Sequence, residues 1–515
     1  MNTKKFNRLF ILGIFLLITP CIVFAQAKGT KPAPKAPAGK TAKPANTAKP
    51  AAAKPEEPVK PQSLYKERKV DPSLAGQKSV AFGELRSGTS GANIDKYMMG
   101  YYVARWTVLD NAKDLHKYRE ELCSDFAAFP DSAKKNFYDV VAKYFKLFAE
   151  HKMVYPACRY NMIYALGELN EKAGSAQSPA VPYAGALDDL IMYVESNDKE
   201  KDFPDYVRLA ALIGIVRHAE LGIKSEQQKN KVLSLFLDMF GSKYAVDKKL
   251  RKEIYIWFKL KALEAIYFMK TPNGPKKTPE ILDALRKIIE NKYEDSEVRS
   301  LAARSIGNMK LADAKQYDYL ALANSIARLA LNITDDELKF IGTENLRDQI
   351  KGTESPAGGA GMGGGPMGGE MMGGDPMMGG DPMMGGMGAP AMSDQSIEKI
   401  RNIIGRIKFD FDSVQTAING QDGKSGVKSN LNDQQKDIAK LLDDVLHEIT
   451  ELNDFLDNGK KDSTGAAAPA KRASRKGKKG KKTGPEPPKV SIPEIKDYLD
   501  EMQIKLKELL NIESN

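Results

Sequence analysis

The sequence predicts an all-α protein, in which an α-solenoid of stacked helix pairs precedes a three-helix bundle that is like a coiled coil. Two observations lead to this prediction. One helical spacing pattern recurs four times between residues 158 and 309, and three heptad-spaced apolar runs follow residue 393. The regions between them are rich in Gly, Pro, Lys or Met, a composition that predicts disordered low-complexity linkers.

These composition shifts predict five parts of the 515-residue chain. They are a signal peptide at 1–27, a disordered Lys/Pro/Ala-rich spacer at 28–94, the solenoid at 95–351, a Gly/Met-rich linker at 352–392 and the bundle at 393–515, which contains a disordered basic loop at 459–490.

The repeated pattern is clearest around Val298, from which small or apolar residues follow at +4, +7, +8 and +11 and a basic residue at +1. These spacings line one face of a helix. Earlier copies begin at Cys158, Val207 and Phe258. The basic anchors of the four copies are Arg159, Arg208, Lys259 and Arg299. They are 49, 51 and 40 residues apart, a period typical of paired-helix repeats.

Breaks rich in Pro, Gly, Asn and Asp divide the solenoid into predicted helix pairs. The pairs are 132–150 with 156–170, 184–196 with 204–220, 226–240 with 248–270, 278–291 with 295–310, and 316–331 with 335–350. Helices between Lys96 and Phe129 precede them. Gly167 and Gly307 each lie nine positions after the start of a copy, and we expect close packing between helices there.

The segments DSEVRSLAARSIG at 295–307 and FPDYVRLAALIG at 203–214 resemble the HEAT and armadillo superfamily. The resemblance covers about 250 of the 515 residues. It implies a stack of helix pairs and a general role in holding partners. It implies no catalytic residues, because a fold does not specify a function.

The resemblance also implies a hydrogen-bonded ladder between repeats, formed by the basic anchor and an Asp a few residues before it. Asp205 and Asp295 stand three or four residues before Arg208 and Arg299. The copy at Arg159 has no such Asp, and the third copy has Lys at the anchor. A continuous ladder is therefore not expected.

The N-terminus has the order of a secretory signal peptide. Basic residues precede an apolar run from Leu9 to Ile18, and Ala25 and Ala27 offer cleavage positions. We therefore expect an exported protein, periplasmic, secreted or attached to the cell envelope. The alternative is an uncleaved anchor running on to Phe24, but this run contains a proline and is shorter than the roughly 20 residues that span a bilayer.

The spacer at 28–94 begins with eight lysines among Pro, Ala and Thr in residues 28–62. It has too few apolar residues to offset the loss of chain entropy, and its prolines favour an extended, semi-rigid conformation. Residues 63–94 are Gly/Ser-rich and show no clear periodicity, so we expect irregular structure there.

The linker at 352–392 contains ten of the chain's twenty methionines. Thioethers are soft ligands that select Cu(I). One hypothesis is therefore a Cu(I) site formed by Met377, Met378, Met383 and Met384. The alternative is a compositional linker, because the tract has no His or Cys and its glycines oppose a defined geometry. No other cofactor is predicted.

After residue 393 apolar residues alternate at spacings of three and four in three runs. The runs extend from Ile397 to Ile418, from Ile438 to Leu456 and from Ile492 to Leu509. They predict three antiparallel helices that close into one bundle. The alternative is that one or more of these seams pair between chains and form a homo-oligomer.

The basic loop contains the segment KRASRKGKKGKK at 471–482, which carries eight cations and no acid in this chain of net charge +11. Its candidate polyanion-binding residues are Lys471, Arg472, Arg475, Lys476, Lys478, Lys479, Lys481 and Lys482. Export and the lack of interleaved aromatic residues argue against nucleic acid. They favour an anionic polymer or lipid head group of the cell envelope. The alternative is a solvated linker without a ligand.

Two cysteines remain after signal cleavage, Cys123 and Cys158. In an oxidising compartment they could form a disulfide across neighbouring helices. The alternative is two buried free thiols that act as small apolar residues.

His218 occupies the +11 position that holds Leu or Met in the other copies, and it is expected to pack at a helix end. The alternative is a pH-sensing or ligand-binding histidine.

Aromatic residues are dense in the first repeats, where they either fill the core or line a concave face. They include Tyr101, Tyr102, Trp106, Tyr155, Tyr160 and Tyr164.

No motif of a known catalytic class is present. The leading hypothesis is an exported, non-catalytic scaffold that binds an unidentified protein or peptide on the solenoid face. The alternatives are an oligomeric structural protein of the envelope and an enzyme with an unrecognised solenoid pocket.

Overall fold

The computed structural model describes residues 68–88, 91–195, 203–241, 244, 250–353, 394–459 and 488–512. Most of these residues are helical and very few lie in strands, which confirms the predicted all-α class. The described strands are β1, Asn170–Lys172, and β2, Val181–Pro182, which pair antiparallel between two helices. The described elements all lie in the unit Ser63–Asn515.

The middle of this unit consists of four helix pairs. The first helices of the pairs are α5 (Asp131–Glu150), α7 (Ala184–Glu195), α9 (Glu226–Phe240) and α12 (Glu280–Glu290). The second helices are α6 (Pro156–Glu168), α8 (Asp205–Leu221), α11 (Lys252–Met269) and α13 (Ser296–Gly307). These bounds agree with the four predicted pairs to within a few residues, because prolines and capping residues mark the helix starts in the sequence.

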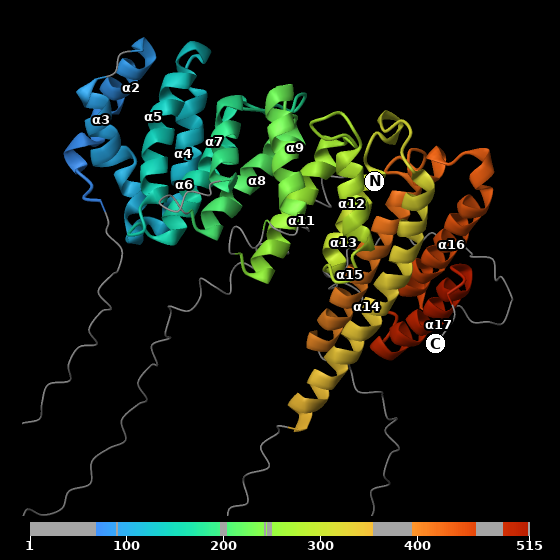
Figure 1. The fold of residues 1–515 in the computed structure, drawn as a ribbon. Coiled ribbons are helices and arrows are strands. Elements are labelled where there is room, and N and C mark those ends of the chain that lie inside the picture. The colour runs from blue at the N-terminus through green and yellow to red at the C-terminus, as the bar shows by residue number, and fades with distance from the viewer. Residues whose placement is uncertain are drawn as a thin grey trace, which may run out of the picture. The chain divides into compact units, whose positions relative to one another are not determined.

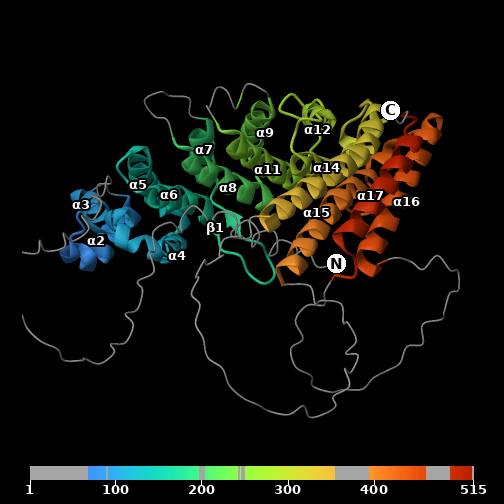
Figure 2. The same ribbon diagram turned by 90° about the horizontal axis from the view of Figure 1, so that it is seen from below.

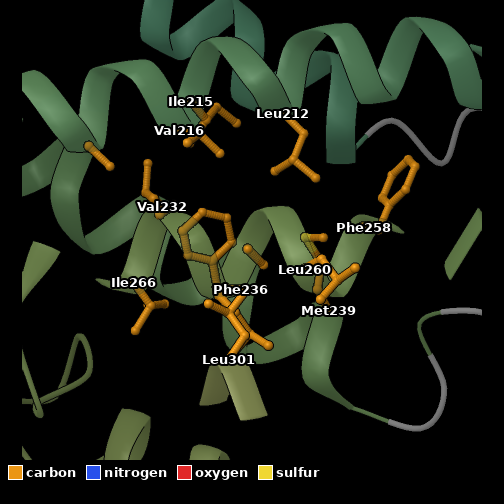
Figure 3. Close-up of a cluster of buried hydrophobic side chains, with 14 of the residues drawn as sticks. Leu212, Ile215, Val216, Val232, Phe236, Met239, Phe258, Leu260, Ile266 and Leu301 are labelled. Carbon is orange, nitrogen blue, oxygen red and sulfur yellow. The ribbon is translucent and has the colours of Figure 1, made fainter. Parts of the chain in front are cut away.

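The helices pack in two layers (Figures 1 and 2). Each first helix contacts the next first helix, and each second helix contacts the next second helix. This is the arrangement of a helical repeat, in which a pair buries its apolar face against its neighbours. Figure 3 shows one such core, where Leu212 of α8, Phe236 of α9 and Ile266 of α11 are fully buried.

Glycine permits a close contact between two second helices. A Cβ atom added to Gly167 of α6 would lie 2.6 Å from Cα of Gly214 in α8. The backbones approach so closely that no side chain fits between them, as expected from the sequence.

The predicted fifth pair, 316–331 with 335–350, is wrong. Residues Tyr319–Thr353 form one continuous helix, α14. The sequence suggested a break at the polar segment around Thr334, but no Gly or Pro interrupts the helix there. Thr334 is buried, and its hydroxyl donates to the Ala330 carbonyl at 2.9 Å, so its polar group is satisfied within the helix.

The partner of α14 is instead α15, Asp394–Asn419. Helix α15 packs against both α13 and α14, so it takes the place of a fifth second helix. A Cβ at Gly307 of α13 would lie 2.0 Å from the Thr416 carbonyl oxygen of α15, and the Gln421 amide donates to the Gly307 carbonyl at 2.9 Å. The segment predicted as a linker between two domains therefore lies between two packed helices.

The last two helices are α16 (Lys436–Asn458) and α17 (Ile492–Leu509), preceded by the short 3-10 turns η7 (Val427–Asn430) and η8 (Asp433–Gln435). The three heptad runs do form helices, and α15 contacts α16, which contacts α17. The bundle differs from the prediction because α14 joins it as a fourth helix and contacts the other three. Apolar seam residues such as Phe411, Leu442 and Leu499 are buried within the chain.

The first described helices correct the predicted spacer at 28–94, which contains more than irregular structure. They are η2 (Pro72–Gln77), α2 (Lys78–Ser87) and α3 (Ala92–Tyr97). Phe82 and Leu85 bury α2 against α5. The helices are short and interrupted by glycines, which hid their apolar pattern in the sequence. The turns η3 (Met98–Tyr102), η4 (Ala104–Thr107), η5 (Leu109–Asp114) and, later, η6 (Leu311–Asp313) are also short.

Helix α4, Leu115–Ala127, completes this N-terminal part. It contacts α6, whereas α2 contacts α5. The N-terminal helices therefore continue both layers of the repeat array.

Candidate partner-binding face

The basic anchors of the repeats are buried, and three of them contact the next repeat. Arg159 is 5% exposed. Its Nε donates to the Ala149 carbonyl at 2.8 Å, and its second guanidinium nitrogen donates to the Tyr206 hydroxyl of the next repeat at 2.7 Å. One side chain thus joins α5, α6 and α8. Arg208 is likewise buried.

The third and fourth anchors also reach the next repeat. Lys259 donates to the carboxylate of Glu294, and its ammonium group lies 4.3 Å from the centre of the Tyr255 ring. Arg299 pairs with Asp336 of α14. Both anchors bury a charge, and the pairing offsets part of the cost of losing hydration.

The family resemblance implies contacts between repeats through Asp205 and Asp295. Asp295 accepts from the Glu297 amide at 3.0 Å and so caps α13. Its neighbour Glu294 pairs with Lys259, and Tyr206, the neighbour of Asp205, pairs with Arg159. Contacts between repeats therefore include residues next to both aspartates.

Exposed and half-exposed charged side chains run across successive second-layer helices. Arg119 of α4 lies 3.4 Å from Glu168 of α6, and Glu168 is close enough to Arg217 of α8 for the two charges to interact. Glu220 of α8 faces Glu264 of α11, which pairs with Lys261 at 2.5 Å. We call Arg119, Glu168, Arg217, Glu220, Lys261 and Glu264 the charge row.

The row continues beyond α11. Arg304 of α13 interacts with Asp412 of α15, and its guanidinium carbon lies 5.6 Å from the Phe409 ring centre. The charges therefore span every second-layer helix from α4 to α15.

Several charges of the row are partly desolvated. Burial raises the pKa of Glu168, although the charges of Arg119 and Arg217 lower it. Burial also raises the pKa of Glu220, and the neighbouring Glu264 carboxylate raises it further. A basic group placed between the two carboxylates would relieve their repulsion.

Aromatic side chains accompany the charge row at its N-terminal end. The Arg119 guanidinium lies 4.6 Å from the Tyr164 ring centre, and Tyr164 stacks on Tyr160 at 5.8 Å. Both tyrosines are half-buried, as are Ile213 of α8 and Trp257 of α11. We call Tyr164, Ile213, Trp257 and the charge row together the inner-helix face.

Sequence reasoning singled out Tyr160 and Tyr164 but missed most of this face. Ile213, Glu264 and Arg304 occupy the same repeat position as Tyr164, six residues after the start of each copy. This position lies between the core positions +4 and +7 of the repeated pattern. A search for half-exposed residues at one repeat position would have found it.

The other predicted aromatic residues belong mainly to the core. Tyr102 and Trp106 are fully buried, whereas Tyr101 and Tyr155 are half-buried. The Tyr102 hydroxyl donates to Asp125 at 2.7 Å. These residues hold the N-terminal helices together.

Both cysteines are free thiols in the structure. Cys158 is buried in α6 and Cys123 is half-buried in α4. Burial raises the pKa of the Cys123 thiol to about 11, so the thiol is protonated at neutral pH.

His218 packs inside α8, where it is 2% exposed. Burial lowers its pKa to about 3, and the neighbouring Arg217 lowers it further, so the ring is neutral at neutral pH. Over the described ranges, no cluster of three or more His, Cys, Asp or Glu side chains is arranged to hold a metal ion.

A pocket of about 510 Å³ lies between α14 and α15. Its lining residues are Phe340, Glu344, Glu398, Lys399, Asn402, Ile403 and Arg406. Lys399 and Glu344 pair across it at 3.5 Å.

Several predicted sites lie outside the described residues. They are the signal peptide, the methionines from Met377 to Met384 and the basic residues from Lys471 to Lys482. Within the part of the chain that is described, no helix has the length and apolar character needed to span a membrane.

Comparison with protein-family models, curated proteins and solved structures finds no match for this chain.

Proposed function

We propose that this protein is an exported scaffold of the HEAT/armadillo type, which binds an extended segment of a partner protein along the inner-helix face. The observation that carries the proposal is the continuity of that face. Partly desolvated charges extend across α4, α6, α8 and α11, and half-exposed apolar or aromatic side chains accompany them on α6, α8 and α11. Repeat proteins bind partners along such continuous surfaces.

The chemistry of the face indicates the kind of segment it would accept. Glu220 and Glu264 repel each other across two helices, so a Lys or Arg of the partner would fit between them. Tyr164, Ile213 and Trp257 offer apolar surface for neighbouring side chains. Aromatic residues of this kind often dominate binding energy at interfaces.

A photoreactive side chain placed at Ile213 tests the proposal directly. We expect it to form a discrete crosslink with one protein of the exported fraction. The same group at Leu147, which is 44% exposed on the first-layer helix α5, is the matched control. Equal crosslinking at the two positions would contradict a dedicated face.

Charge reversal supplies the energetic test. The double variant Glu220→Lys, Glu264→Lys should weaken binding of the crosslinked partner by at least about tenfold, because like charges would then meet. Unchanged affinity would show that the partner does not use this part of the face.

The basic loop provides a second proposed contact, with an anionic polymer or lipid of the envelope. Its ends lie together, because a Cβ at Gly459 would be 3.3 Å from the Lys489 carbonyl oxygen. Deleting residues 471–482 should therefore leave the helices intact while reducing salt-sensitive retention in the envelope. Retention that is unchanged at low salt would remove this part of the proposal.

An oligomeric structural protein remains the alternative. The heptad seams that would join two chains are buried within one chain here. We therefore expect light scattering to report a monomer. A stable oligomer lost on deleting residues 393–515 would favour the alternative instead.

A further inference from the structure

A carboxyl group is buried where α15 packs on the repeat array. Asp410 of α15 is 1% exposed, and neither of its carboxyl oxygens has a hydrogen-bond partner among the described residues. The Ser300 hydroxyl of α13 is fully buried and faces it without reaching hydrogen-bond geometry. An ionised carboxylate in such a place loses its hydration without compensation.

The surrounding charges do not compensate either. Glu337 of α14 is also 1% exposed and interacts with Asp410. Among the described residues, Arg406 on α15 is the cation that acts on both acids. Its guanidinium already donates two hydrogen bonds to Glu337, one at 3.1 Å from Nε. Two buried acids thus share one guanidinium, so only one of them is fully paired when both are ionised.

The remaining charges around α15 act from further away or are already paired. Glu297 on α13 adds negative charge near Asp410. Asp336 on α14 pairs with Arg299, and Lys408 on α15 pairs with Asp457 of α16. Asp412 interacts with Arg304 on the other side of the helix. No described element therefore supplies a second cation to Asp410.

We propose that Asp410 is a proton switch, which holds α15 against α13 and α14 in its neutral form and weakens this docking when it loses the proton. The switch would control whether the C-terminal helices complete the array. It acts at the packing surface around Gly307 and does not depend on the partner proposed above.

The direction of the effect follows from the two states of the acid. Burial raises the pKa of docked Asp410 from 3.8 to about 7, and the Glu337 carboxylate adds to the rise while Ser300 and Arg406 oppose it. Undocked Asp410 would titrate near 3.8. Between these values the docked state binds more protons, so docking weakens as pH rises and becomes constant above about pH 7.

Hydrogen exchange of the full-length protein tests the proposal. From about pH 5 to about pH 7 the protection of α15 amides, corrected for intrinsic exchange, should fall by up to about a hundredfold. The isosteric variant Asp410→Asn should abolish this fall. Glu398→Gln, which changes an exposed acid on the same helix, is the matched control and should behave as the wild type.

The same fall in Asp410→Asn as in the wild type would overturn the proposal, as would protection that increases with pH in the wild type. If Asp410→Asn does not fold, infrared spectroscopy of the wild type decides. We expect the carbonyl band of a protonated carboxylic acid to disappear with a midpoint near pH 7. A spectrum without such a titrating band would also overturn the proposal.

Discussion

The junction of α6 with α8 and the junction of α13 with α15 use the same packing but different chain connections. At the first, Gly167 meets Gly214 across one intervening helix. At the second, Gly307 meets the Thr416 carbonyl after the whole of α14 and residues 354–393. The difference shows that complementary surfaces, and not nearness in the sequence, determine which helix comes next in the array.

The two regions also bury opposite kinds of titratable group. His218 lies in the regular array, where burial lowers its pKa to about 3. Asp410 lies at the second junction, where burial raises its pKa to about 7. In both cases burial disfavours the charged form. Because one group is a base and the other an acid, the array should lose stability in acid while the α13–α15 junction gains it.

Adding a methyl group to Gly307 should produce the largest effect. In Gly307→Ala the new Cβ would lie 2.0 Å from the Thr416 backbone oxygen, and neither backbone can move without separating the helices. We expect the free energy of unfolding to fall by about 3 kcal/mol in urea titrations. Hydrogen exchange should show the loss of protection concentrated in α15.

Gly405→Ala is the matched control on α15, because no atom lies within 4 Å of the Cβ it adds. It should be neutral or stabilise the helix by about 0.5–1 kcal/mol. Gly167→Ala extends the comparison to the other junction. It should loosen the packing of α6 on α8 without a selective loss of hydrogen-exchange protection in α15. Equal effects of Gly307→Ala and Gly405→Ala would contradict the close approach of α13 and α15.

The pH dependence of the array gives the next largest effect. Unfolded His218 has a pKa near 6.5 and folded His218 a pKa of about 3, so the unfolded state binds more protons between these values. The contribution to stability is complete above pH 6.5 and is lost as pH falls. From pH 6.5 to about pH 5 we expect a loss of about 2 kcal/mol.

The variant His218→Met should remove this acid-dependent loss, because other copies of the repeat carry Met at the same position. His116→Gln, which alters an exposed histidine of α4, should leave it unchanged. Urea unfolding of the three proteins at both pH values measures the difference. An equal acid-dependent loss in His218→Met would show that other groups cause it.

The regular array was predictable from the sequence because each helix pair repeats the same local pattern. Anchors such as Arg299 mark the pattern, and prolines such as Pro156 mark where helices begin. Their buried partners were less predictable. The rung from Lys259 ends at Glu294 and not at the adjacent Asp295, since which side chain reaches an anchor depends on the offset between neighbouring helices.

The C-terminal region was harder to predict because its decisive contacts are distant in the sequence. The heptad runs correctly indicated helices, but a heptad seam does not state which surface covers it. Helix α14 showed no separate heptad signal, and the low-complexity segment after it suggested a domain boundary. The inner-helix face was missed for a related reason, because its members are ordinary charged residues until neighbouring helices bring them together.

Cutting the chain within residues 354–393 should have the smallest effect of these changes. It distinguishes most directly between two independent domains on a tether and one continuous array of helices. If that segment joined two independent domains on a tether, a cut at an inserted protease site would release residues 394–515 as a separate species. The structure predicts that both fragments remain together, because α15 is buried against α13 and α14, and α17 packs on α14. Size-exclusion chromatography before and after cleavage should give the same elution volume, while cleavage of Gly307→Ala should release more of the C-terminal fragment. Complete separation of the wild-type fragments under native conditions would contradict the continuous array, since the contacts of α13 and α14 with the C-terminal helices should hold the fragments together.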